Sequence, residues 1–272
     1  MILKQLRVNS GAICEPTNCY IVQDEKTKET MVIDPGGEVN KIIEMLDILQ
    51  AKLKYIYITH CHGDHIGALV ELKNAKGGKI LIHRLEKEGL QDKNISLTDY
   101  VGVEDVHLDP DSIVDDGDKI HIGNIEFRVI HTPGHTKGGS SLYCEEEKLV
   151  FSGDTLFHGT WGRTDLPTSN FMDIMNSITE KILKLPDEKQ SEFYHYIVVI
   201  GAKEALAPLT IFLTASTAPL FAESFYCAAQ SVKDRCNMLI ETMRDWMEKL
   251  FIYTIDDLDK PKERRKGTRY IV

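Results

Sequence analysis

Six consecutive residues, His60 to His65, constrain the fold of this chain more than any other segment. They read HCHGDH and directly follow an apolar run, residues 55–59 (YIYIT), which is typical of a buried strand. Four ligand-type side chains on one short loop have no use in packing a core. The segment therefore predicts a strand whose carboxyl end presents candidate metal ligands, namely His60, His62, Asp64 and His65.

The spacing within this loop indicates how the side chains would share two ions. Imidazoles at positions i and i+2 of an extended loop point to the same side, so His60 and His62 can both reach one zinc-like ion, with nitrogens ~2.0–2.1 Å from it. If the chain turns into a helix at Gly63, which permits the bend, Asp64 and His65 point toward a second ion.

A tetrahedral ion needs more ligands than this loop offers, so other loops must complete the site. Two further candidates stand at turns that directly follow predicted strands. His135 lies in the segment HTPGHT, residues 131–136, and Asp154 lies in the segment SGDT, residues 152–155. At such positions the backbone can present a side chain at the rim of a sheet.

Hydrophobic periodicity predicts an α/β fold that begins with antiparallel strands and continues as a βαβ region. Two hairpins and a further helix follow, and the polar residues 91–118 are predicted to form a solvated loop. The predicted strands are Ile2–Val8, Asn18–Gln23, Glu29–Asp34, Tyr55–Thr59, Lys79–His83, Lys119–Ile122, Ile125–Ile130, Ser140–Cys144, Lys148–Ser152 and Phe193–Ile200. The predicted helices are 38–50, a stretch through Leu69 and Leu72, and Asn170–Leu185.

Composition excludes several classes of function. At 272 residues the chain can bury a core without disulfides or a structural metal, so a metal would be functional. The net charge of −10 argues against a broad phosphate-binding face, and we expect no nucleic-acid partner. Six cysteines without a CxxC pair, and an N-terminus without a signal-peptide pattern, indicate a reducing, cytoplasmic compartment.

The segment after residue 188 differs from the rest of the chain. Its uncharged stretch Ala205–Ala222 contains two prolines, so a membrane span is disfavoured there. A long amphipathic helix is predicted over residues 232–250, and its apolar stripe could pack on this chain or on a second copy, which leaves a homodimer open. The basic end, KPKERRKGTR, is expected to be a solvated terminus.

Six short motifs follow one another along the chain: NCY (18–20), DPG (34–36), THCHGDH (59–65), HTPGHT (131–136), SGDTLF (152–157) and GRTD (162–165), with LPDE (185–188) after them. Together they resemble the metallo-β-lactamase fold superfamily, and within it the hydroxyacylglutathione hydrolase (glyoxalase II)-like branch. The motifs are specific for fold and metal binding and weak for substrate. The resemblance implies a four-layer αβ/βα sandwich of two mixed β-sheets flanked by helices. Residues 1–188 would form this domain core, and residues 189–272 an atypical C-terminal segment.

The resemblance also implies roles for the candidate ligands. The family usually completes its second metal site with a histidine in a Gly-His-Gly turn, but this sequence carries GAK at the aligned residues 201–203. Either His195 supplies that ligand from within a strand, or the sixth protein ligand is absent. The remaining ligands divide between two ions: His60, His62 and His135 for the first, Asp64 and His65 for the second, and Asp154 bridging both.

These ligands imply a metal-dependent hydrolase acting on a small-molecule substrate. We expect one or two Zn²⁺ ions, with iron or manganese as alternatives. A water held by the ions would attack the carbonyl of a thioester or related ester, with Asp154 positioning the water and Asp64 serving as ligand and proton acceptor. A β-lactamase would usually carry Cys at the position of Asp154. The other interpretation is a catalytically impaired relative that binds metal and acts as a binding or scaffold protein.

Residues that neighbour the candidate ligands in the sequence are predicted to have structural roles or to line the site. Cys61 lies between two ligands, and we expect the loop to turn it away from the metals, which makes it non-catalytic. His131 is interpreted as structural or as support for a ligand, and His158 could line the pocket. Arg163 and Asp165 either brace a loop as a salt bridge or contact the substrate.

Overall fold

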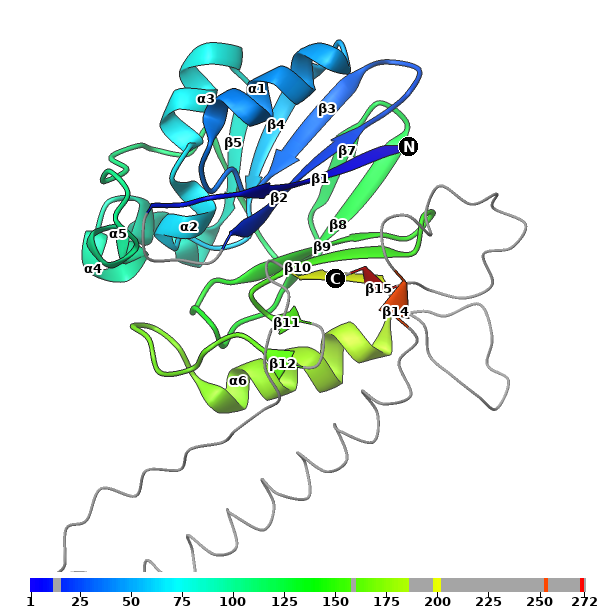
Figure 1. Cartoon of the computed structure of the whole chain (residues 1–272). Coiled ribbons are helices and arrows are strands. Elements are labelled where there is room, and N and C mark those ends of the chain that lie inside the picture. Colours follow the sequence, from blue (N-terminus) through cyan, green and yellow to red (C-terminus); the bar gives the residue numbers. More distant parts are fainter. Residues whose placement is uncertain (12–15, 158–159, 186–197, 202–251, 254–269, 272) are drawn as a thin grey trace, which may run out of the picture.

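Two mixed β-sheets lie face to face, and helices cover the outer face of each sheet (Figure 1). This computed structural model describes residues 1–11, 16–157, 160–185, 198–201, 252–253 and 270–271. The layers run helix, sheet, sheet, helix. The four-layer αβ/βα sandwich predicted from the sequence is therefore confirmed.

The first sheet holds six strands in sequence order, from β1 to β6. The first three strands pair antiparallel, as predicted for the start of the chain. β3, β4 and β5 pair in parallel because α1 (Val39–Ile48) and α3 (Leu69–Lys76) return the chain between them, and β6 also runs parallel to β5. The strands are β1 (Ile2–Val8), β2 (Thr17–Gln23), β3 (Glu29–Ile33), β4 (Lys52–Ile58), β5 (Lys79–His83) and β6 (Ser112–Val114).

The second sheet has the strand order β13-β10-β9-β8-β7. Its strands from β7 to β10 pair antiparallel, and the predicted turn at Gly123 and Asn124 joins β7 to β8. β13, from beyond residue 188, adds to β10 in parallel. The strands are β7 (Lys119–Ile122), β8 (Ile125–His131), β9 (Ser140–Cys144), β10 (Leu149–Gly153) and β13 (Val198–Gly201).

Alternating side chains of the strands build separate apolar layers on the two faces of each sheet. In β4, Tyr57 points between the sheets, where it shares a cluster with Phe127 and Phe151. Ile56 and Ile58 point to the opposite face, into the cluster that includes the buried residues of α1 and α3. The rigid strand β4 is thus anchored on both faces immediately before the HCHGDH loop.

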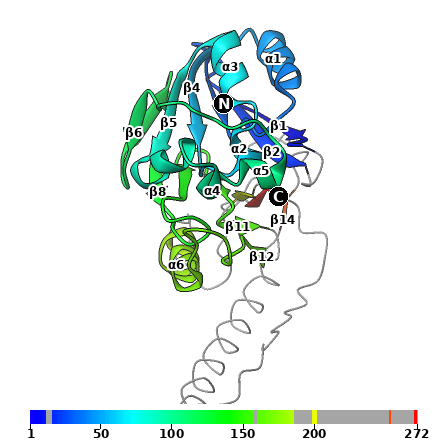
Figure 2. The ribbon, with the colours of Figure 1, turned by 90° about the vertical axis from the view of Figure 1, so that its left-hand side faces the viewer.

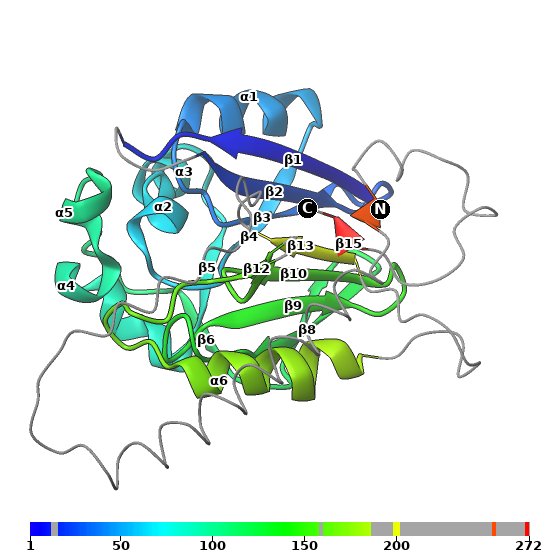
Figure 3. The ribbon, with the colours of Figure 1, turned by 60° about the horizontal axis from the view of Figure 1, so that its bottom comes forward.

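A helical segment covers the outer face of the second sheet and begins with α6 (Phe171–Asn176) (Figure 3). Asn170 caps it, as predicted, because its side chain accepts hydrogen bonds from two backbone N–H groups of the first turn. Ile174, Ile178 and Ile182 are buried against the sheet. The predicted helix Asn170–Leu185 changes type along its length: it continues as the π-helical turn η2 (Ser177–Lys181) and the 3₁₀ turn η3 (Ile182–Lys184). The short strands β11 (Leu156–Phe157) and β12 (Thr160–Trp161) pair with each other near this segment.

The prediction of a solvated loop over residues 91–118 holds for residues 103–110, which form no helix or strand and are mostly exposed or half-buried, and is wrong for the segments on either side. This stretch contains two short helices and β6, and α5 lies beside α2 (Figure 2). The buried residues Thr98 and Val101 of α5 pack beside Gly63 of the HCHGDH loop. Elements of three or four residues are too short to show a hydrophobic period, so the prediction was based on the polar composition of the stretch. The short elements at this edge are α2 (Gly63–Ile66), η1 (Arg84–Leu90), α4 (Lys93–Ser96) and α5 (Thr98–Val101).

Several predictions fall outside the described residues: the stretch Ala205–Ala222, the helix over 232–250, the basic end, His158 and His195. Beyond β13, the described residues form β14 (Ile252–Tyr253) and β15 (Tyr270–Ile271), which pair in parallel. None of the helices in the described part of the chain is long and apolar enough to cross a membrane. The division of the chain at residue 188 stays a prediction, as does a homodimer.

Candidate metal centre

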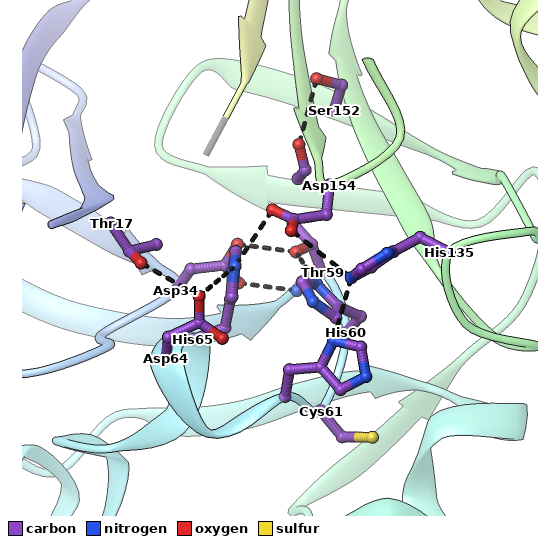
Figure 4. Close-up of polar contacts among 12 residues, drawn as sticks. Thr17, Asp34, Thr59, His60, Cys61, Asp64, His65, His135, Ser152 and Asp154 are labelled. Carbon is purple, nitrogen blue, oxygen red and sulfur yellow. Dashed lines mark hydrogen bonds and ion pairs between the residues drawn. The ribbon is translucent and has the colours of Figure 1, made fainter. Parts of the chain in front are cut away.

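All the side chains predicted as ligands meet at one edge of the two sheets (Figure 4). They come from the loop after β4, the loop between β8 and β9, and the turn after β10. They are between 0% and 8% exposed although all are polar. The residues that the structure brings together are His60, His62, Asp64, His65, His135 and Asp154.

Three histidine rings form the first group of donors. Donor atoms of His60, His62 and His135 lie within 4.8 Å of one another. The rings meet edge to face, with centroids 4.7 to 4.8 Å apart, and His62 Nδ1 lies 2.9 Å from His135 Nε2. Such a set of converging nitrogens fits one tetrahedral ion with a fourth position left for another ligand.

Carboxylates surround the second group of donors. Donor atoms of His60, His65 and Asp154 also lie within 4.8 Å of one another, so His60 belongs to both groups. His65 Nε2 lies 3.2 Å from Asp154 Oδ1 and 3.8 Å from Asp64 Oδ2. The other oxygen of Asp154 lies 3.4 Å from His135 Nε2. Asp154 therefore faces both groups, as the resemblance implies for a bridging ligand.

Hydrogen bonds at Nδ1 fix the orientation of two of these rings. The Nδ1–H of His65 donates to Asp34 Oδ2 at 2.9 Å, and the Nδ1–H of His135 donates to the backbone carbonyl of Arg163 at 2.8 Å. Carboxylate and carbonyl oxygens only accept, so the proton of each ring lies on Nδ1. In the neutral form of each ring the lone pair is on Nε2, the nitrogen that faces Asp154.

Asp34 and Thr59 orient the third ring in the same way. The backbone N–H and the hydroxyl of Thr59 donate to the two oxygens of Asp34 at 2.8 and 2.6 Å. Since the hydroxyl proton is given to the carboxylate, Thr59 Oγ1 accepts from His60 Nδ1 at 3.2 Å. Asp34 thereby holds His65 directly and His60 through Thr59.

Buried nitrogen atoms show that a metal ion fits this donor set. The Nε2 atoms of His60 and His62 are buried and have no hydrogen-bond partner among the described residues. An unsatisfied buried polar atom costs about 1–3 kcal/mol. A cation between the two donor groups would satisfy His60 Nε2, which belongs to both, and zinc, iron and manganese all accept mixed imidazole and carboxylate ligands. The residues present therefore fit a divalent metal.

The two groups differ in their protonation. Burial, aided by repulsion from neighbouring rings, lowers the pKa of His60 well below its ordinary value and that of His62 to about 3. Burial also opposes the protonation of His65, but nearby carboxylates, Asp34 first among them, outweigh it and raise its pKa. The neutral imidazole binds metal, so His60 and His62 are in their binding form at neutral pH. The second group concentrates negative charge that a cation would neutralise.

Asp64 is held by α2, by a residue that follows β1 and by the first residue of β2. Its Oδ2 accepts from Thr17 Oγ1 at 3.2 Å, and its backbone carbonyl accepts from Ser10 Oγ at 3.2 Å. Gly63 begins α2, and a Cβ on it would lie 3.2 Å from Thr98 Cα. Glycine at this position therefore lets α5 pack closely against the ligand loop.

The neighbouring residues lie outside both donor groups. The Cys61 thiol points away from the cluster, and burial raises its pKa, in agreement with a non-catalytic role (Figure 4). His131 Nε2 contacts the carbonyl of Lys137 at 3.0 Å, which is a structural role. Arg163 and Asp165 form a two-bond salt bridge, each bond 2.9 Å long, as expected for a loop brace.

Sequence reasoning assigned no role to Asp34, Thr59 or Thr17. The first two had a usable signal, because each is the last residue of a predicted strand and these strands, β3 and β4, are parallel neighbours whose carboxyl ends share one edge. Thr17 had none, since its contact with Asp64 joins residues 47 positions apart.

The fold and the donor cluster define an αβ/βα protein with a candidate two-metal centre. Comparison with known families agrees: the model of the Metallo-beta-lactamase superfamily matches residues 12–192. This match spans more than half of the chain, and the chain belongs to the metallo-β-lactamase superfamily. The fold of this superfamily binds divalent metals, and its members are metallo-hydrolases.

Known relatives show what kinds of protein the chain is similar to. Hydroxyacylglutathione hydrolase GloC of Haemophilus influenzae is 32% identical over 173 residues, which cover 63% of this chain and 81% of that protein. The crystal structure of the BLEG-1 B3 metallo-beta-lactamase has a TM-score of 0.66 and 30% identity, covering 75% of this chain and 92% of that one. TTHA1623 in a di-iron-bound form has a TM-score of 0.61 and 27% identity, covering 74% and 92%.

Proposed function

We propose that this chain is a metal-dependent hydrolase of thioesters or related esters. The observation that carries the proposal is the buried cluster in which two groups of donor atoms share His60. The proposed ligands of the first ion are His60, His62 and His135, those of the second are Asp64 and His65, and Asp154 would bridge both.

The side chains of this cluster suit hydrolysis without a Ser or Cys nucleophile. Divalent ions, when bound, lower the pKa of a coordinated water and polarise a carbonyl oxygen. Asp154, whose two oxygens face the two groups, would orient the attacking water. Asp64 Oδ2, which Thr17 holds in place, would accept its proton.

A thioester is the proposed substrate class for two reasons. One relative is named hydroxyacylglutathione hydrolase, and the assigned groups are bases and ligands. A thiol has a pKa of about 8.5, so it can leave as a thiolate without first taking up a proton. Hydrolysis of a thioester therefore requires no proton donor for the leaving group, in contrast to hydrolysis of an ordinary ester.

Zinc is the proposed metal, because the first group offers only imidazole nitrogens. The carboxylates of the second group also suit iron or manganese, and one similar structure contains two iron ions.

A second candidate function is that of an impaired, metal-binding relative. β13 pairs with β10 so that Gly201 lies opposite Gly153, directly before Asp154. The sequence after Gly201 continues with Ala202 and Lys203, and neither is a usual metal ligand. This observation favours a second position with fewer protein ligands than the first.

Metal content and turnover test the proposal together. The wild-type chain, His60→Ala and a control, His121→Ala, would be assayed on thioesters, lactones and β-lactams, with metal per chain measured by atomic emission. His121 is a fair control because it is exposed and pairs with Glu126 at 2.9 Å, on the outside of β7. We expect thioester turnover that His60→Ala abolishes and His121→Ala retains. One metal or none, with no turnover on any substrate, would favour the impaired relative.

A further inference from the structure

A buried carboxylate outside the donor cluster joins two loops of the candidate centre. Glu86 lies in η1, the 3₁₀ helix that follows β5, and it is 2% exposed. Its Oε2 accepts a hydrogen bond from the backbone N–H of Cys61, and its Oε1 accepts one from the backbone N–H of Gly138, both at 2.8 Å. One side chain thus spans from one loop to the other.

These two amides belong to the loops that carry the first group of donors. Cys61 is the residue between His60 and His62, and Gly138 follows His135 by three positions. The distance between the two amides therefore limits how closely the two loops can approach each other. It thereby also limits the separation of the histidine rings that these loops carry.

Backbone hydrogen bonds brace the loop that carries His135. The N–H of Thr132 donates to the carbonyl of Gly139 at 2.7 Å, and the N–H of Gly134 donates to the carbonyl of Thr136 at 2.9 Å. These bonds close the loop on both sides of His135. A displacement of the Gly138 amide, which Glu86 holds, would therefore also displace the His135 ring.

η1 is packed tightly against both loops. A Cβ on Gly138 would lie 2.7 Å from the backbone nitrogen of Glu86, and a Cβ on Gly89 would lie 2.0 Å from Cys61 Sγ. Neither contact can be relieved without a shift of the chain. η1 therefore lies between the loops at a distance that only glycine permits on each side.

We propose that Glu86 is a positioning residue that fixes the separation of the two ligand loops and thereby sets the affinity of the first metal position. The inference rests on the proposed metal centre. Only a carboxylate offers two acceptors and no donor here. In Glu86→Gln the amide group would turn its NH₂ toward one of the two N–H donors, so at least one bond is lost.

Glu86→Gln is compared with Glu88→Gln, a matched control in the same helix. Glu88 also reaches the His135 loop, through Lys137 at 2.7 Å, but this pair is exposed. Zn²⁺ affinity is measured by competition with a chromogenic chelator, and the ligand geometry by the absorption spectrum of the Co²⁺-loaded protein. We expect Glu86→Gln to weaken Zn²⁺ binding on the order of 10- to 100-fold and to change the Co²⁺ spectrum, with Glu88→Gln within about twofold of wild type.

The outcomes separate this inference from the proposed function. A folded Glu86→Gln with wild-type affinity and an unchanged Co²⁺ spectrum overturns the role of Glu86 and leaves the metal centre intact, whereas a wild-type chain that binds no Zn²⁺ overturns the centre itself. If Glu86→Gln does not fold, Gly138→Ala pushes the loops apart while keeping the carboxylate. The same loss of affinity is then expected, and unchanged binding overturns the inference.

Discussion

The donor cluster has two halves that differ in charge and in completeness. The histidine half is His60, His62 and His135, and the carboxylate half is His65, Asp64 and Asp154. The first half consists of imidazole nitrogens, two of which (His60 and His62) burial keeps neutral, in loops joined by Glu86. The second half relies on negative charge, and the strand that ends beside it is followed by Ala202. We infer that the first position binds by preorganised geometry and the second mainly by charge.

The largest effects are expected from removing one ligand in each half. His62→Asn should eliminate the tightly bound ion and lower kcat/KM by about 10³-fold or more, because an ion contributes several kcal/mol of transition-state stabilisation. His65→Asn should leave one tightly bound ion per chain. Metal per chain after dialysis against a weak chelator checks both variants. An equal loss of metal in the two would show that the halves do not bind separately.

Asp34→Asn should act on both halves at once, since Asp34 holds His65 directly and His60 through Thr59. Asparagine would turn an NH₂ group toward a donor, which should weaken metal binding on the order of 10- to 100-fold and lower the free energy of unfolding by about 2 kcal/mol. Chelator competition and urea unfolding measure the two quantities. Loss confined to one half would limit the role of Asp34 to that half.

A stacked histidine pair outside the donor cluster shows how burial lowers the pKa of a histidine that is not a candidate ligand. His83 is 4% exposed and stacks on His131, with ring centroids 4.3 Å apart. Burial, followed by the charge of His131, lowers the pKa of His83 to about 4. The unfolded state, with a histidine pKa of about 6.5, takes up the proton first. The stability that this pair contributes is therefore complete above about pH 6.5 and is lost as the pH falls toward 4.

His83→Gln should consequently flatten the pH dependence of unfolding in the metal-free protein. We expect the fall in unfolding free energy between about pH 6.5 and 4 to become smaller by on the order of 1–3 kcal/mol. Urea unfolding in the presence of a chelator provides the measurement. The pH dependence of the unfolding free energy that remains in His83→Gln arises in part from the histidine half of the cluster. A variant with the wild-type slope would assign the whole dependence to other groups.

Arg163→Ala should have the smallest effect. Arg163 holds His135 through its backbone carbonyl, while its exposed guanidinium pairs with Asp165. Exposed pairs contribute about 0–1 kcal/mol, so Zn²⁺ affinity should stay within about threefold of wild type. A tenfold loss of affinity would show that the guanidinium supports the histidine half. A tenfold rise in KM at unchanged affinity would instead place it in contact with substrate.

The sequence predicted the donor residues far better than the groups that orient them. Each donor lies in a short motif directly after a strand, so the neighbouring residues in the sequence are enough to predict its role. Glu86 contacts residues 25 and 52 positions away, and its own surroundings, RLEKEGL, read as an exposed charged turn. Hydrogen bonds between distant segments leave no local pattern, which is why Glu86 went unrecognised.

The fold shows the same division between local and distant information. The layers were predictable because the apolar run of strands such as β4, and the spacing of Ile42 and Leu46 in α1, report burial directly. α4 and α5 were missed because their burial depends on the ligand loop against which α5 packs. The change of helix type after Asn176 likewise has no signature in the apolar spacing of the segment.

The parallel pairing of β13 with β10 affects whether shortened chains associate with one another. All five residues of β10, Leu149–Gly153, are buried, and without β13 their backbone N–H and C=O groups would form an open sheet edge. Open apolar edges are templates on which other chains add as extra strands. A fragment that ends at residue 188 would therefore keep every assigned metal ligand and yet be prone to self-association.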